Sequence, residues 1–298
     1  MLRYVDHAIV GVTDLDAAAH DYVGRLGFAV GAGGVHPGMG TRNRLIVLDP
    51  EYIELLARVP GAEVSPLSPV GAMLRRAPGC VGFALGSDDI EADIAAMRER
   101  GLAVDGPIEG RLETAPGVVA RGWRTARPCD DARLGMEAWR LPFLIEHDSA
   151  GRERLERIAR PGGLHAHAVG ARSLSHLTIA VRNLAAGLRA YRLAFGLEPD
   201  DEGEDPMLRA RTARLPLPRG ALVLAAPLPG DGPLARGLRA QGEGLYSIGV
   251  AVDNLQDSID IMRGQGISVR VEEPEGILLS ARPDPAGAHG AQLEFVQT

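Results

Sequence analysis

The chain has 298 residues, 45% of them hydrophobic and 24% charged, which suits two domains that each bury a core. Its net charge of -7 and its 4% of aromatic residues argue against nucleic-acid binding, which needs a basic surface or stacking rings. No apolar run approaches the roughly 20 residues that cross a bilayer, and two cysteines make no disulfide framework, so we expect a cytoplasmic protein without a membrane partner.

The first predicted unit begins at the N-terminus. The run MLRYVDHAIVGV, which contains His7, predicts a strand and not a signal peptide. Asp14 is a plausible N-cap for the helical pattern that follows, and Gly27 is placed where that helix needs a left-handed stop. Strand-rich sequence comes next and closes with the apolar run YIELLARV. The unit is therefore a strand, a helix and about three strands.

The same order returns three times along the chain, beginning near Val81, at SHLTIAV around His176, and near Tyr246. The corresponding caps and stops are Asp88 or Asp89 with Gly101, Asn183 with Gly196, and Asn254 with Gly266. The closing strands are LPFLIEH, ALVLAAP and QLEFVQ. This repeat predicts an α+β fold of four βαβββ modules.

A domain boundary is expected after the second module. The run DSAGRERLERIARPGGLHAHAVGARS is charged and then glycine-rich, which predicts a short helix and a linker. We therefore predict a first domain over residues 1–148, a helix and linker over 149–171, and a second domain over 172–298. The acidic run EPDDEGEDP near Asp200 predicts an exposed loop. If each domain pairs its own two modules, either a monomer or a homodimer is compatible with the sequence.

This repeated unit resembles the vicinal oxygen chelate superfamily, which includes glyoxalase I, extradiol dioxygenases and bleomycin-resistance proteins. The first half is most similar to the glyoxalase-like domain family, and the second half matches more loosely through SHLTIAVRNLAAGLRAYRLAFGL. The runs that carry the first match are DHAIVGVTDLDAAAHDYVGRLGFAV, GGVHPGMGTRN, YIELL and LPFLIEH. The resemblance implies that two modules pair edge to edge and that their sheets curve into a cup around a divalent metal, giving two paired, cup-shaped domains.

The resemblance also implies which residues would hold that metal, because each module can offer a ligand from its first strand and one from its last. The first domain then offers His7, Glu54 and, if the register of FLIEH is right, Glu146. The second module has Gly82 where a ligand is expected. The second domain offers only His176 and Glu294, and these are weaker candidates.

The spacing supports this register, because His7 and Glu54 are 47 residues apart, as are Ser247 and Glu294. One imidazole and two carboxylates suit a divalent ion such as Zn, Ni, Fe or Mn. Three protein ligands leave positions open for water or substrate, so the metal would act as a Lewis acid with Glu54 as a catalytic group. The alternative is that these polar side chains lie inside a cup that holds no metal.

His36 lies in GGVHPGMGTRN, where glycine and proline predict a tight loop. It is a candidate for proton transfer and substrate contact, while Thr41 and Asn43 are candidates for hydrogen bonds to substrate. As a residue at the rim of a site it would contribute little to stability. The alternative is a histidine on a surface loop.

Two functions follow from the resemblance. The leading one is a metal-dependent glyoxalase or dioxygenase-type enzyme, a lyase, isomerase or dioxygenase that acts on a small oxygenated organic molecule in the first-domain cup. The alternative is a non-catalytic small-molecule binding protein of the bleomycin-resistance type. A further alternative is a structural or regulatory duplicate that has lost its site. His7 with Glu54 favours the enzyme, whereas Gly82, Ser247 and Val223 favour the binding protein.

Overall fold

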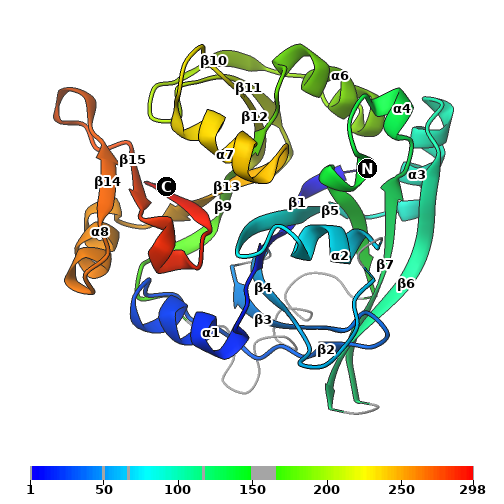
Figure 1. Ribbon diagram of the computed structural model, residues 1–298, viewed down its shortest axis with the longest axis horizontal. Coiled ribbons are helices and arrows are strands. Elements are labelled where there is room, and N and C mark those ends of the chain that lie inside the picture. The colour runs from blue at the N-terminus through cyan, green and yellow to red at the C-terminus, as the bar shows by residue number, and fades with distance from the viewer. Residues whose placement is uncertain (1, 49–50, 66–67, 116–117, 149–165, 298) are drawn as a thin grey trace.

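The computed structural model describes residues 2–48, 51–65, 68–115, 118–148 and 166–297 (Figure 1). The first half of the chain holds two βαβββ modules. The elements of the first are β1 (Leu2–Gly11), α1 (Leu15–Gly24), β2 (Val35–His36), β3 (Thr41–Val47) and β4 (Tyr52–Arg58). The second follows α2 (Pro69–Leu74) and consists of β5 (Gly79–Ser87), α3 (Ile90–Glu99), β6 (Val104–Ala115), β7 (Val118–Pro128), α4 (Asp131–Leu134), η1 (Ala138–Arg140) and β8 (Phe143–His147).

The second half repeats the same order. The third module consists of β9 (Ala171–Ala180), α6 (Leu184–Phe195), β10 (Asp201–Asp205), β11 (Ala210–Pro216) and β12 (Ala221–Pro227). The fourth follows α7 (Pro233–Gln241) and consists of β13 (Gly244–Val252), α8 (Leu255–Gly264), β14 (Val269–Glu272), η2 (Pro274–Gly276), β15 (Ser280–Pro283), η3 (Pro285–Ala288) and β16 (Gln292–Gln297). The predicted α+β fold of four βαβββ modules is therefore confirmed.

The modules pair into two eight-stranded sheets of the same plan. In each sheet the first strands of the two modules are antiparallel neighbours, β1 with β5 and β9 with β13. Each first strand is also parallel to the last strand of its own module. The first sheet closes into a barrel in the order β1-β4-β3-β2-β6-β7-β8-β5, and β2 meets β6 through the single pair Val35 and Glu113. The second sheet stays open, in the order β10-β11-β12-β9-β13-β16-β15-β14.

The helix boundaries follow the predicted caps and stops. Asp14 accepts hydrogen bonds from the backbone N–H groups of Asp16 and Ala17, and Asn254 does the same at the start of α8. Asp89 and Asn183 cap α3 and α6 in the same way. The predicted stops all have a positive φ, at Gly27, Gly101, Gly196 and Gly266. Local sequence signals therefore set these boundaries.

The two sheets share one hydrophobic core. Its largest cluster includes Tyr22 and Phe28 from the first module and Phe295 from the last. Helix α1 packs against η3, where the Tyr22 hydroxyl donates to the Ala288 carbonyl over 3.2 Å. Figure 1 shows α1, in blue, beside the red C-terminal segment. The halves are therefore joined by apolar packing as well as by the chain.

The predicted linker lies mostly outside the described residues, since 149–165 are not described, so the helix expected there and the domain boundaries stay predictions. In the described end of the linker, the ring of His167 accepts a hydrogen bond from the Ala29 N–H and donates to the Val47 carbonyl, each over 2.9 Å. Both contacts fix the start of the second half against the first module.

The acidic run near Asp200 is not the loop that its composition suggests. Asp201–Asp205 is the edge strand β10, paired with β11 through backbone hydrogen bonds. Its side chains are mostly exposed, because an edge strand pairs through its backbone alone. The charges on these side chains discourage a further strand from adding to this edge of the sheet.

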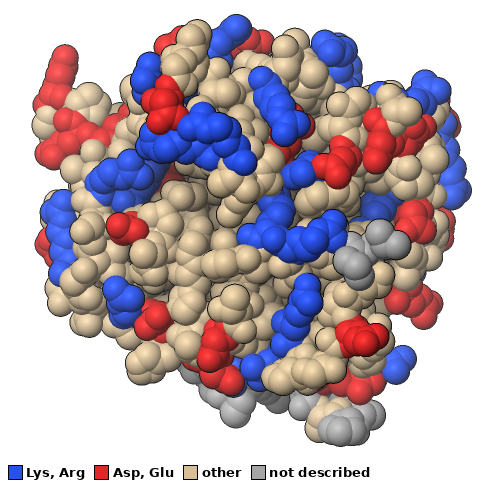
Figure 2. Space-filling view, in the orientation of Figure 1, with Lys and Arg blue, Asp and Glu red and all other residues tan. Residues whose placement is uncertain are grey.

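Arginine and acidic side chains are interspersed on the face shown in Figure 2. None of the described helices is long and apolar enough to cross a membrane.

Candidate functional site

A cavity of about 840 Å³ fills the inside of the first barrel. Every strand of the barrel except β5 contributes described residues to its wall, and α2 with its preceding loop covers one side. The wall is largely apolar, with Ile9, Leu56, Met73, Trp123, Phe143 and Ile145 among its members. The polar side chains on the same wall include His7, His36, Thr41 and Glu54. A mostly apolar chamber with polar groups on its wall suits a small organic ligand.

His7 is held in the wall on three sides. The ladder between β1 and β5 is interrupted at Asp6, which has no partner on β5 and lies beside His7. The Nδ1 atom of His7 is 2.8 Å from Asp6 Oδ1, and the imidazole stacks on Tyr52 with ring centroids 4.6 Å apart. His7 is only 3% exposed. Its remaining ring nitrogen, Nε2, faces Glu54 Oε2 at 3.8 Å.

Asp6 determines which nitrogen of His7 carries the proton. This carboxylate is 0% exposed, and the Nε2 atom of His147 approaches its two oxygens at 3.1 and 3.2 Å. An ionised carboxylate only accepts hydrogen bonds, so both imidazoles donate to it. In neutral His7 the proton is therefore on Nδ1, and the Nε2 lone pair points toward Glu54 and the cavity.

Glu54 is oriented by an amide. Asn43 Nδ2 donates to Glu54 Oε1 over 2.6 Å, and Asn43 Oδ1 accepts from the Gly34 N–H over 3.0 Å. Because the Gly34 N–H can only donate, the orientation of the Asn43 amide is fixed. The second oxygen of Glu54, Oε2, accepts no hydrogen bond from any residue in the described part of the chain. This oxygen is therefore free to accept a hydrogen bond or a proton from a ligand.

His36 belongs to the same network. Its Nε2 lies 3.2 Å from Asn43 Nδ2 and 3.7 Å from Glu54, and its Nδ1 lies 2.9 Å from Thr41 Oγ1. Since Asn43 Nδ2 donates, His36 Nε2 accepts and Nδ1–H donates to Thr41. His36 is 7% exposed and lies in strand β2 on the cavity wall. It lines the cup as predicted, but from a buried strand and not from the tight loop at the rim that the sequence suggests.

The predicted substrate contacts are mostly taken up inside the protein. Thr41 lines the cavity but accepts from His36, and Asn43 is used by Glu54, His36 and Gly34. Asn43 does not reach the cavity wall. These two residues therefore position the catalytic candidates.

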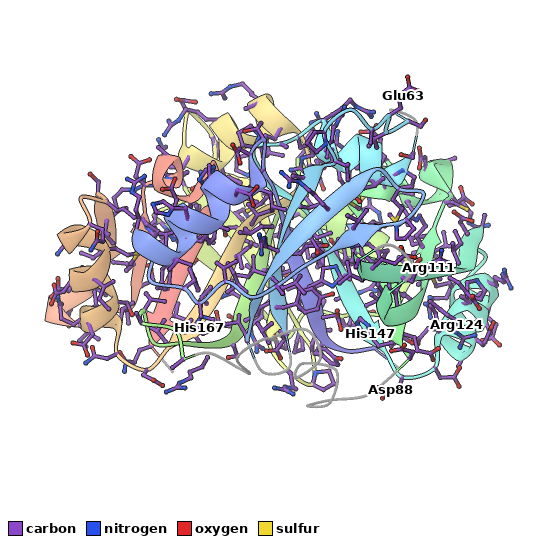
Figure 3. The ribbon with its side chains drawn as sticks, turned by 90° about the horizontal axis from the view of Figure 1, so that it is seen from below. Glu63, Asp88, Arg111, Arg124, His147 and His167 are labelled. Atoms are coloured by element: carbon purple, nitrogen blue, oxygen red, sulfur yellow. The ribbon has the colours of Figure 1, made fainter. Side chains whose placement is uncertain are left out.

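Glu146 does not join His7 and Glu54. Phe143 and Ile145 of β8 face the cavity. Because successive side chains of a strand point to opposite faces, Glu146 points to the outside of the barrel. There it pairs with Arg124 and accepts from the Ile90 N–H at the start of α3 over 3.2 Å. Arg124 lies at the outer edge of the barrel in Figure 3. The ligand set of His7, Glu54 and Glu146 is therefore not assembled.

The remaining residues do not fit the divalent metal that the resemblance implies. On β5 the Gly82 position is covered by Met73, since a Cβ there would meet the Met73 sulfur at 3.0 Å. The lone pair of His36 is engaged by Asn43, which leaves two available ligands, His7 and Glu54. No group of three His, Cys, Asp or Glu side chains among the described residues is arranged to hold a metal. A catalytic metal usually has three protein ligands.

In the second sheet an arginine occupies the corresponding region. His176 Nε2 lies 3.3 Å from Glu294 Oε2, as the sequence predicts. Arg282, however, donates to Glu294 Oε1 over 2.9 Å and to Asp205 over 2.8 Å. Burial alone would raise the pKa of Glu294, but His176 and Arg282 lower it from 4.5 to about 2. His176 and Glu294 therefore form an internal ion network.

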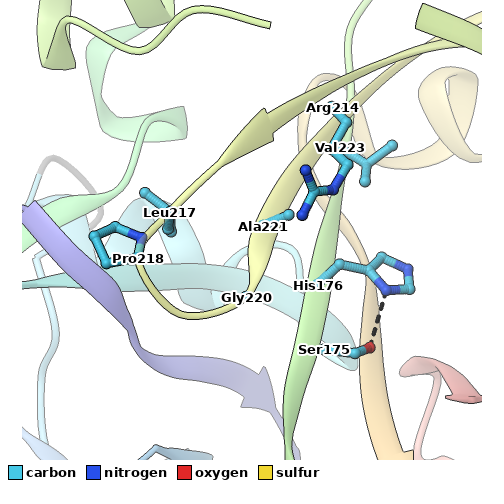
Figure 4. Close-up of a pocket in the computed structure, with 8 residues that line it drawn as sticks. All are labelled: Ser175, His176, Arg214, Leu217, Pro218, Gly220, Ala221 and Val223. Atoms are coloured by element: carbon cyan, nitrogen blue, oxygen red, sulfur yellow. Dashed lines mark hydrogen bonds between the residues drawn. The ribbon is translucent and has the colours of Figure 1, made fainter. Parts of the chain in front are cut away.

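A second cavity, of about 460 Å³, lies beside this network (Figure 4). His176 and Arg214 are its charged or titratable lining residues among those described. His176 Nδ1 is 3.0 Å from Ser175 Oγ, and Arg214 pairs with Asp200. Both polar groups are already partnered, so this cavity offers no poised base.

Two residues were not predicted from the sequence, one behind His7 and one on the cavity wall. Asp6 precedes His7, and simple alternation would turn it to the other face of the strand; only the bulge brings it to the imidazole. Arg127 lines the cavity on β7 together with Trp123 and Thr125. Their spacing of two residues, a strand period, is the one signal that could have placed Arg127 there.

Two family models match the chain. Residues 5–181 match the model described as a glyoxalase-like domain, and residues 175–277 match that of the glyoxalase/bleomycin resistance protein/dioxygenase superfamily. No curated protein matches the sequence.

Solved structures with the same fold include a hypothetical protein from Staphylococcus aureus, with 15% identity, 99% of both chains covered and a TM-score of 0.64. A triple mutant of 4-hydroxymandelate synthase from Streptomyces coelicolor has 15% identity, with 100% of this chain and 93% of that chain covered and a TM-score of 0.66. Methylmalonyl-CoA epimerase from Mycobacterium tuberculosis has 23% identity over 43% of this chain and 89% of that one, with a TM-score of 0.39. At 15% identity the likeness to the first two structures concerns the fold alone.

Proposed function

The chain belongs to the glyoxalase-like domain family, and on that premise we propose that it is an enzyme that moves protons on a small oxygenated organic molecule in the first-barrel cavity. The observation that carries this proposal is the pair of His7 Nε2 and Glu54 Oε2, 3.8 Å apart. Each is fixed from behind, His7 by Asp6 and Glu54 by Asn43, and each leaves its free acceptor toward the cavity. Two positioned proton acceptors on an apolar wall suit general base catalysis.

A 2-hydroxy ketone or aldehyde is the substrate type that uses both groups. Glu54 Oε2 takes the proton from the carbon that bears the hydroxyl, and the electron pair moves into the neighbouring carbonyl. His7 Nε2 takes the hydroxyl proton, which gives an enediolate. Return of the two protons to the opposite carbon and oxygen completes an isomerisation, with atoms and electrons balanced. His36, 3.7 Å from Glu54, lies where it contacts the substrate beside the carboxylate.

The chain has no lysine, so a Schiff base on a side-chain amine is not an alternative route. A divalent metal, whether Zn, Ni, Fe or Mn, would serve as a Lewis acid in the reaction that the family resemblance implies. Because two side chains alone are available to hold it among the described residues, the steps above depend on His7 and Glu54 alone.

A non-catalytic small-molecule binding protein is the second candidate. The large apolar wall and the missing third metal ligand favour it. The two candidates predict the same ligand site but differ in whether Glu54 removes a proton.

Hydrogen exchange separates the two candidates. Small 2-hydroxy ketones are incubated with the protein in D2O, and loss of the carbon-bound proton is followed by NMR. Wild type should accelerate exchange of at least one of them, and Glu54→Gln should lower that rate by about a hundredfold or more. The matched control is Glu91→Gln, an exposed carboxylate on α3 outside the cavity, which should keep the wild-type rate.

Exchange that persists in Glu54→Gln would contradict the assigned base. Ligand binding without any exchange would favour the binding protein.

The expected location is a reducing cytoplasm, in which the two free cysteines, Cys80 and Cys129, would stay reduced. A small molecule is the expected partner, and the assembly is a monomer or a homodimer.

A further inference from the structure

Arg127 places a positive charge in the wall of the first cavity. It lies on β7, and its guanidinium is 6.0 Å from the centre of the Phe143 ring. Among the described residues the guanidinium has no hydrogen bond and no ion pair. Burial lowers the pKa of Arg127, and the charge of Asp105 offsets part of that effect.

The Arg127 side chain is half-buried, so its guanidinium keeps part of its water and faces the cavity. An aromatic ring replaces only a small part of the hydration that is lost, which leaves N–H groups that an anion can use. Other arginines near the barrel differ in this respect. Arg124, on the same strand, pairs with Glu146 and Glu91, and Arg111 at the cavity edge pairs with Glu113. Arg127 is therefore the arginine of this wall that is available to a ligand.

We propose that Arg127 binds the carboxylate of the substrate, so that the cavity selects small organic acids over their neutral analogues. The planar fork of a guanidinium matches the two oxygens of a carboxylate. The wall contains two arginines, Arg111 and Arg127, and Arg111 is paired with Glu113. Because three carboxylates, Glu54, Glu63 and Glu109, line the same wall, a monoanion suits it better than a doubly charged phosphate. This inference depends on the proposed function for the choice of cavity.

Phe143 relates the bound acid to the reacting groups. Its ring contacts the Arg127 guanidinium. The same ring also packs edge to face with the His7 imidazole, and the centroids of these two rings are 5.6 Å apart. A carboxylate at Arg127 is then separated from His7 and Glu54 by about the width of one aromatic ring. The acid group and the reacting carbon of the substrate should therefore be only a few bonds apart.

The rest of the wall suits an apolar body on such an acid. Met39 and Ile108 line the cavity and are 42% and 48% exposed, so they mark its open side. Trp123 also lines it and contacts His36 edge to face. The substrate class is a short organic acid with an apolar side chain that also carries the 2-hydroxy ketone or aldehyde group of the proposed reaction.

Calorimetric titration tests the inference with 3-phenyllactate and 2-hydroxyisocaproate, each compared with its amide. Wild type should bind at least one acid about tenfold to a hundredfold more tightly than the matching amide, because a hydrogen-bonded charge pair is lost in the amide. Arg127→Gln should remove that preference, and Arg127→Lys should restore part of it. Arg124→Gln, on the same strand and the outer face, should bind like wild type.

Thermal unfolding shows whether these variants fold. Arg127→Gln should melt no lower than wild type, because the substitution removes a half-buried charge that has no ion-pair partner among the described residues. If Arg127→Gln does not fold, Arg127→Met provides the same comparison with an apolar side chain of similar length.

Equal affinity of wild type and Arg127→Gln for the acids would overturn the inference, as would amides that bind as tightly as acids. Absence of binding by both acids at millimolar concentration would overturn it too. The Glu54→Gln variant separates this inference from the proposed function. If Glu54→Gln and wild type both prefer acids over amides but neither accelerates hydrogen exchange, only the proposed catalysis fails. If wild type accelerates exchange and Glu54→Gln does not, but wild type binds acids and amides equally, only the role of Arg127 fails.

Discussion

Arg282 donates a hydrogen bond to Glu294 over 2.9 Å, on the strand pair that corresponds to the site of Glu54 in the first barrel. The two carboxylates occupy the same place in their modules but have different partners. A cation neutralises Glu294, whereas the neutral amide of Asn43 orients Glu54 and leaves its charge uncompensated. This difference is the structural reason for assigning the chemistry to the first barrel.

The first prediction concerns stability in acid. The pKa of Glu294 is about 2 in the fold, against 4.5 for an ordinary glutamate, so its stabilising charge is fully present above pH 4.5 and is lost as the pH falls toward 2. Glu294→Gln should reduce the free energy of unfolding by about 3 kcal/mol at neutral pH. The gap from wild type should narrow in acid, as measured by urea unfolding at a series of pH values.

An exposed carboxylate on edge strand β10 provides the control. Glu202→Gln should follow wild type at every pH, because solvent surrounds Glu202 before and after unfolding. A gap for Glu294→Gln that is independent of pH would contradict the assigned ion network.

The second prediction concerns Asn43. Its replacement by alanine leaves Gly34 N–H, Glu54 Oε1 and His36 Nε2 without their shared partner in a buried position. The expected loss is about 2–4 kcal/mol in the free energy of unfolding, by chemical denaturation. Asn183→Ala removes one exposed cap and should cost about 1 kcal/mol. Equal losses for the two variants would argue against the network around Glu54.

The third prediction concerns the thiols. Cys80 is buried, which raises the pKa of its thiol to about 12, whereas Cys129 is exposed. A thiol reagent should modify one cysteine per native chain and both after denaturation. Mass spectrometry of the modified peptides identifies the site. Rapid modification of Cys80 in the native protein would show that the packing between the two sheets opens readily.

The fourth prediction concerns metal content. Protein purified without chelator should contain clearly less than one equivalent of Zn, Ni, Fe or Mn by elemental analysis, because two ligands hold a metal poorly. A metal that binds only the folded state raises the Tm, and its removal lowers the Tm. Because we expect no bound metal, addition of a chelator should leave the Tm unchanged. One equivalent that is retained by wild type and lost in Glu54→Gln would instead restore the metal-dependent mechanism.

The modules could be read from the sequence because each boundary has a local physical cause. Asp14 and Asn254 supply acceptors to free N–H groups, and Gly27 and Gly196 adopt a positive φ that other residues avoid. These effects act within a few residues of the chain. The closure of the first sheet into a barrel depends instead on the distant pair Val35 and Glu113, which no local pattern shows.

The site was predictable only in part, because the direction of a side chain depends on the phase of a strand. His7 and Glu54 meet as expected. In β8 the apolar residues Phe143, Leu144 and Ile145 cover both faces, so alternation could not show that Glu146 turns outward. Arg282 reaches Glu294 from a neighbouring strand, and such a contact exists only after the sheet has formed.

The core that the two sheets share makes the second half indispensable even though its own site is closed. A chain cut after the first module pair would leave Tyr22 and Phe28, both nearly free of solvent contact, facing water without the residues that now cover them. Such a fragment would expose an apolar face and aggregate. The second half therefore completes the core around these two aromatic residues.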